Sequence, residues 1–68
     1  MNVDRKQINK KFRKLLYVAG MSADEVNSIW REQGIRNIQQ KKDTGELVVQ
    51  AARIPSIIVP GIIWIPAS

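Results

Sequence analysis

The chain of 68 residues carries 11 Lys and Arg against 6 Asp and Glu, a formal net charge of +5 at pH 7. A chain of this length forms one domain at most and leaves little room for an enzyme cleft. The sequence has no Cys and no His, which excludes disulfides, thiolate chemistry and the side chain that most often serves as general base and metal ligand. The composition therefore favours a non-enzymatic protein with an anionic partner, and we expect neither a cofactor nor a metal.

The excess positive charge lies entirely at the start of the chain. Residues 1–20 have six basic side chains and one acidic one, a net charge of +5. Residues 21–53 have five of each sign, and residues 54–68 have no charged side chain. The sequence is thus divided into a basic segment, a neutral middle and an apolar end.

The basic segment is predicted to form an amphipathic helix over Asp4–Ala19. Asp4 can cap its N-terminus, and Gly20 can end it. One stripe has the apolar spacing of a buried face; its residues are Ile8, Phe12, Leu15, Leu16 and Ala19. The opposite face places an aromatic ring among cations and is predicted to contact the partner; its residues are Lys6, Lys10, Arg13, Lys14 and Tyr17.

A second helix is predicted to begin at Ser22 and to end near Gln33. Ser22 and Glu25 have the spacing of a capping box, and Gly34 can end the helix. The link of residues 20–22 is so short that the two helices should form a tight corner. The predicted core of this corner consists of Leu16, Val26, Ile29 and Trp30.

This corner resembles the helix-turn-helix family. The positions that match the family pattern are Gly20, Met21, Val26 and Ile29. Leu16 departs from it, because the family has a small residue there. The resemblance implies that the second helix could enter the major groove of DNA, and its outward side chains that could contact bases are Asn27, Ser28 and Arg31. Asp24 and Glu25 at the start of this helix would oppose such binding, because phosphates repel carboxylates.

The next segment is predicted to form a β-hairpin with strands over Arg36–Lys42 and Glu46–Ala52. Asp43-Thr44-Gly45 has turn chemistry, and the residues after it are β-branched or apolar. A third helix over Ile35–Lys42 is the competing interpretation. Lys41 and Lys42 at the tip could touch a nucleic-acid backbone as a wing does, or could keep the turn solvated.

The apolar end is predicted to be extended. Residues 54–68 contain three prolines, which block a helix, and the segment is shorter than the roughly 20 residues of a membrane-spanning helix. We expect it to form a tail that is packed on the domain of residues 1–53 or flexible. Its first half, to Val59, is expected to be core. The apolar anchors that it could offer to a partner are Ile58, Ile62 and Trp64.

The opening Met1–Gly20, which includes the run KKFRKLLYVAG over residues 10–20, resembles the small RNA-polymerase-binding transcription regulators of Xanthomonas phages. The chain length and the apolar end add to the resemblance. It implies a protein that binds the host polymerase, inhibits sigma-dependent initiation and promotes antitermination in the host cytoplasm. It assigns no contact residue.

Together these observations predict a small α+β domain: two helices in a helix-turn-helix-like corner, a β-hairpin and an apolar tail. We expect a cytoplasmic monomer that regulates transcription by binding bacterial RNA polymerase, without a membrane and with nonspecific nucleic-acid contact left open. The alternative is a winged helix-turn-helix repressor that uses Asn27, Ser28, Arg31, Lys41 and Lys42. A membrane-active peptide driven by the tail is a third interpretation.

Overall fold

Two helices form the first half of the chain in the computed structural model, which describes residues 5–67. Helix α1 spans Arg5–Val18, and its predicted cap at Asp4 lies outside the described residues. The helix ends as predicted at Gly20, whose φ is 98°. The Gly20 N–H donates to Tyr17 O at 2.9 Å and the Met21 N–H donates to Leu16 O at 3.1 Å, the Schellman pattern that satisfies the last carbonyls of a helix.

Helix α2 spans Ala23–Gln33, and its predicted capping box is confirmed. The Glu25 N–H donates to Ser22 Oγ at 3.2 Å, and the Ser22 N–H donates to Glu25 Oε1 at 2.8 Å. Gly34 follows in the left-handed conformation, with φ 60° and ψ 50°. Both boundaries are therefore fixed by interactions within a few residues of each helix end.

Three strands follow the helices: β1 over Ile35–Gln40, β2 over Leu47–Ala51 and β3 over Ile62–Pro66. The order across the sheet is β1-β2-β3, with β1 antiparallel and β3 parallel to β2. The β1–β2 pair confirms the predicted hairpin, and the competing helix over residues 35–42 is wrong. Gly45 in its connection has a φ of 76°, a conformation that glycine adopts at little cost.

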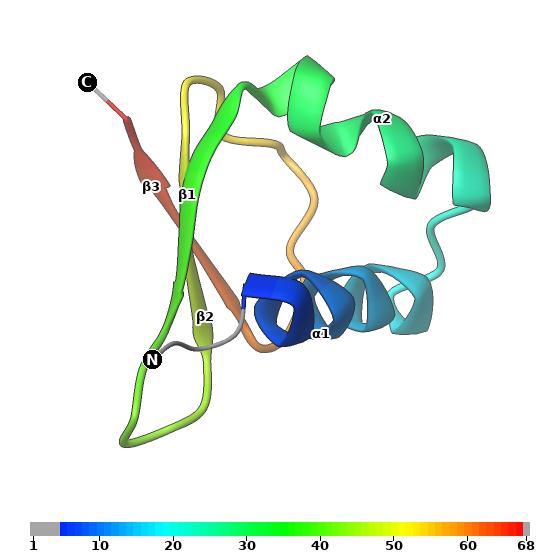
Figure 1. Ribbon diagram of the computed structural model, residues 1–68. Helices are drawn as coiled ribbons and strands as arrows, with labels where there is room; N and C mark the ends of the chain where they lie inside the picture. Colours follow the sequence, from blue (N-terminus) through cyan, green and yellow to red (C-terminus); the bar gives the residue numbers. More distant parts are fainter. Residues whose placement is uncertain (1–4, 68) are drawn as a thin grey trace.

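The prediction of a hairpin followed by a tail is wrong, because the apolar end supplies the third strand. Leu47 pairs with Ile62, and the register continues to Ala51 opposite Pro66. Without β3, the second edge of β2 would present unpaired N–H and C=O groups. Residues 52–61 carry the chain back to the start of β2, on the same side of the sheet as the helices (Figure 1).

The core lies between the helices and one face of the sheet (Figure 1). Its buried residues are Phe12, Leu16, Val26, Ile29, Leu47, Val49, Val59 and Ile62. The predicted core positions Leu16, Val26 and Ile29 are confirmed, and Trp30 is half-buried against the cluster. The Phe12 ring meets the Trp30 ring edge-on at a centroid distance of 5.1 Å. Each helix thus contributes one apolar face, and the opposite face of α1 stays in solvent.

Residues 54–59 do not form the closed core that was expected of them. Val59 is buried with 2% of its surface exposed, but Ile57 and Ile58 are exposed. The half of the apolar end that is expected to be core is thus mostly at the surface, whereas residues 62–66, which follow it, form β3 in the sheet. Within residues 5–67, no helix has the length and apolar character that crossing a membrane requires.

Candidate functional site

The solvent side of α1 carries the basic side chains expected to contact the partner. We call the exposed set Lys6, Lys10, Arg13, Lys14 and Tyr17 the cationic face. All five residues are exposed, and Tyr17 is 47% exposed. The next residue, Val18, is 77% exposed, so the cations lie beside a small apolar area at the end of the helix.

Two open grooves run along this helix. The first, of about 810 Å³, is lined by the whole cationic face together with Asn9 and Val18. The second, of about 430 Å³, lies on the flank of the helix next to Leu15. Lys10, Lys14 and Val18 line both grooves. The cationic face is therefore not flat, and side chains of a partner could pack into its open grooves.

The basic side chains of the cationic face donate no hydrogen bond to the described part of the molecule. Within residues 5–67, the cationic side chains that donate hydrogen bonds are Lys11, to Gly45 O at 2.8 Å, and Arg53, to Glu32 O at 3.3 Å. Neither belongs to the cationic face. Its four cations are thus presented to solvent, where an anionic surface can reach them.

Lys11 differs from its neighbours in the same basic run. It is half-buried, and its ammonium group ties α1 to the connection between β1 and β2. The bond joins residues 34 positions apart, so no local pattern distinguishes Lys11 from Lys10 or Lys14. Within this basic run, Lys11 has a structural role.

Two of the three predicted apolar anchors are buried or half-buried. Ile62 is only 8% exposed and belongs to the core. Trp64 is half-buried against the core, with its ring 6.0 Å from that of Phe12 and its Nε1 atom buried without a hydrogen-bond partner among the described residues. Pairing of β3 with β2 turns both side chains toward the helices. Ile58 is 89% exposed and remains accessible.

The residues of the alternative nucleic-acid set lie on α2 and on the connection between β1 and β2. Asn27, Arg31, Lys41 and Lys42 are exposed. Ser28 is half-buried, and its hydroxyl donates to Asp24 O at 2.9 Å, so it is engaged within its own helix. Asp24 and Glu25 are exposed in the first turn of α2. Their carboxylates therefore meet any phosphate that approaches this end.

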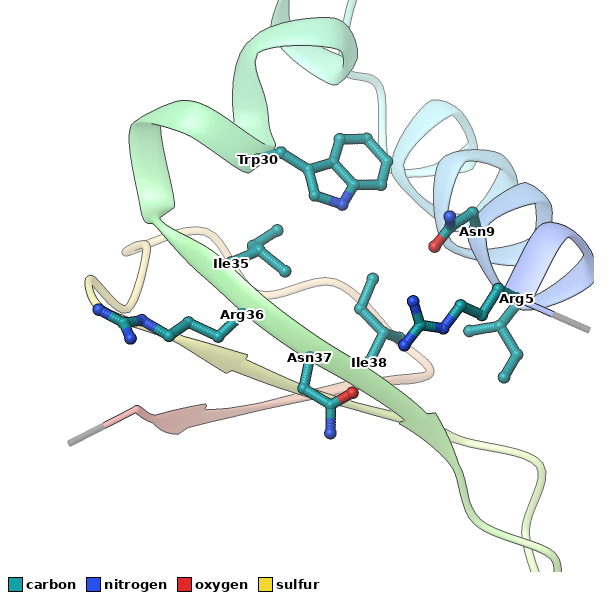
Figure 2. Close-up of a pocket in the computed structure, with 8 residues that line it drawn as sticks. Arg5, Asn9, Trp30, Ile35, Arg36, Asn37 and Ile38 are labelled. Carbon is teal, nitrogen blue, oxygen red and sulfur yellow. The ribbon is translucent and has the colours of Figure 1, made fainter.

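One concave site was missed from the sequence. A pocket of about 170 Å³ lies between α1, α2 and β1, and its lining includes Arg5, Asn9, Trp30, Ile35 and Ile38. In Figure 2 the Arg5 guanidinium, the Asn9 carboxamide and the Trp30 indole nitrogen surround one hollow, whereas Arg36 points away from it. These residues come from three elements, and their spacing in the chain gives no signal of a common site.

Within residues 5–67 no group of three or more acidic, His or Cys side chains is placed to hold a metal ion. No protein-family model, curated protein or solved structure matches this chain.

Proposed function

We propose that this protein is a non-enzymatic transcription regulator that binds bacterial RNA polymerase through the cationic face of α1. In this role it inhibits sigma-dependent initiation and promotes antitermination. The observation that carries the proposal is that the segment holding the entire net charge presents five of its six cations, with Tyr17 among them, to solvent. The resemblance of residues 1–20 to the polymerase-binding regulators of Xanthomonas phages supplies the choice of partner.

The chemistry of this face suits docking. Concentrated positive charge steers a small protein toward an acidic surface and sets its orientation. Affinity in such interfaces comes from a few aromatic and apolar anchors, and Tyr17 and Val18 are the exposed candidates on this helix. A small protein can change a large enzyme by occupying a surface that another factor needs, because different affinities for two states of the enzyme are sufficient.

The decisive experiment is affinity capture of RNA polymerase after nuclease treatment, with a charge-matched pair of variants. Lys10→Glu with Lys14→Glu reverses two charges on the cationic face, and Lys41→Glu with Lys42→Glu reverses two at the β1–β2 connection. We expect the first pair to weaken capture by about tenfold or more, and the second by no more than about twofold. Equal losses would show that only net charge matters, and unchanged capture by the first pair would reject the cationic face as the docking surface.

Transcription measured with purified components tests the regulatory part of the proposal. The native chain should lower run-off synthesis from a sigma-dependent promoter and raise read-through of a terminator. The Lys10→Glu and Lys14→Glu variant should lose both effects together, because both depend on the same docking step. A variant that fails to bind polymerase yet still alters transcription would contradict this mechanism.

A winged helix-turn-helix repressor is the second candidate. Its support is the order of elements, two helices followed by the β1–β2 hairpin, with Asn27 and Arg31 exposed on α2. The exposed Asp24 and Glu25 weigh against it. Selection from a random duplex pool tests this function: enrichment of one sequence, lost with Arg31→Ala, would favour the repressor, since a bidentate base contact contributes about 1–3 kcal/mol.

A further inference from the structure

The pocket between α1, α2 and β1 is rich in hydrogen-bond donors, and none of its lining residues within 5–67 is acidic. Figure 2 shows Arg5, Asn9 and Trp30 with their polar groups around the same hollow. A guanidinium and an indole N–H donate hydrogen bonds and cannot accept them. A ligand that satisfies both groups must therefore bring acceptor atoms.

The size and walls of the pocket narrow the class of ligand. Its volume of about 170 Å³ is well above the roughly 10–15 Å³ needed for one water, so a short side chain fits. Ile35 and Ile38 supply apolar walls, and these would strip water from a charged group without replacing its hydrogen bonds. A ligand with an aliphatic stem would cover the isoleucines and keep its charge at the donors.

The number of cations beside the hollow restricts the charge of the ligand. Arg36 lines the pocket, but its side chain points away from the hollow, which leaves Arg5 as the guanidinium beside it in Figure 2. One guanidinium matches the two oxygens of a single carboxylate in a bidentate geometry. A phosphate dianion carries more negative charge than Arg5 alone can balance. A phosphodiester carries a single charge, as a carboxylate does, but it brings no aliphatic stem to cover Ile35 and Ile38. Charge and the apolar walls together thus favour a carboxylate on an aliphatic stem.

We propose that this pocket binds a glutamate side chain of the protein partner, with its carboxylate at Arg5 and its methylene groups against Ile35 and Ile38. The inference rests on the proposed docking function and assigns a specificity pocket next to the cationic face. Asn9 lines both the pocket and the groove of the cationic face. One acidic segment of the partner can therefore occupy both.

The pocket itself can be tested by NMR titration of the isolated protein with propionate, which reproduces the glutamate side chain. The chain has two tryptophans: the Trp30 indole N–H lies at the pocket, and the buried Trp64 Nε1 serves as the internal reference. We expect a saturable shift of the Trp30 resonance in the millimolar range, typical of a ligand of about five non-hydrogen atoms, and no comparable shift for Trp64. Propionamide, which lacks the charge, should leave both unchanged.

A matched pair of arginine variants separates the pocket from general electrostatics. Arg5→Gln should weaken propionate binding about fivefold or more, and Arg13→Gln on the cationic face should change it less than about twofold. Equal effects of the two variants, an unsaturable shift or an equal response to propionamide would overturn the pocket assignment. Binding of inorganic phosphate about tenfold tighter than propionate would overturn the choice of a carboxylate and point to a nucleic-acid backbone.

Polymerase capture then tests the occupant separately from the docking function. If the proposal holds, Arg5→Gln weakens capture more than Arg13→Gln does, although both remove one charge from α1. Capture that depends on Lys10 and Lys14 but not on Arg5 would preserve the docking function and reject the glutamate pocket. Propionate binding with no polymerase capture at all would reject the docking function and, with it, the partner's glutamate as the occupant.

Discussion

Two apolar stretches of similar composition lie close together in the sequence but differ in solvent exposure and in strand pairing. Residues 54–58 contain three isoleucines and one proline, and residues 62–66 contain three isoleucines, a tryptophan and a proline. Ile54, Ile57 and Ile58 are exposed at 48%, 39% and 89%, whereas Ile62 is 8% exposed. The second stretch is paired with β2 along its whole length. Ile63 and Ile65 of the same strand are half-buried, so the paired stretch is less exposed than the unpaired one although both are apolar.

The largest effect is expected from a truncation in the second stretch. Ile62→Ala removes a core side chain and should destabilise the fold by about 2–5 kcal/mol. Since a domain this small is expected to have only about 3–5 kcal/mol of stability, the variant should be largely unfolded at 37 °C. Urea unfolding followed by circular dichroism measures this. Ile58→Ala is the matched control, and an equal loss from both variants would contradict the different burial of the two stretches.

An intermediate effect is expected at Gly61, between the two stretches. Gly61 has a φ of 90°, and an added Cβ would lie 3.3 Å from Leu15 Cδ1. Gly61→Ala should lower the free energy of unfolding by about 1–2 kcal/mol, because alanine disfavours the left-handed backbone conformation. The displacement of Leu15 should add a smaller loss. Gly20→Ala is the comparison: its φ is 98°, but nothing lies within 4 Å of the new Cβ. Thermal unfolding of both variants isolates the contact with Leu15, and greater loss from Gly20→Ala would contradict it.

The smallest effect on stability is expected from Ile58→Ser. Because this side chain is 89% exposed, the free energy of unfolding should change by less than about 0.5 kcal/mol. As the one predicted apolar anchor that remains accessible, Ile58 should nevertheless contribute to polymerase capture, with a loss of about fivefold on substitution. Isothermal binding measurements alongside unfolding check both parts. Unchanged affinity would restrict the docking surface to α1.

Helical periodicity predicts which basic residues form the cationic face, but it does not predict the role of Lys11. The spacing of Lys6, Lys10, Arg13 and Lys14 was sufficient to place them opposite the apolar stripe, and all four are exposed. Lys11 has the same charge and lies in the same run, but it bonds to Gly45 O. Only the folded chain brings the β1–β2 connection next to this helix. A count of basic residues therefore overstates the charge that is free to dock.

The elements whose ends depend on near neighbours were determined by the sequence itself. The capping box of Ser22 and Glu25, the helix end at Gly20 and the turn at Gly45 each involve contacts within a few residues. The third strand and the Arg5–Trp30 pocket were decided by tertiary structure, because they join residues far apart in the chain. The sequence of an apolar segment does not indicate which strand edge it will pair with. The edge of β2 that pairs with residues 62–66 lies far from them in the chain, and its backbone N–H and C=O groups are satisfied only when the two segments meet in the fold.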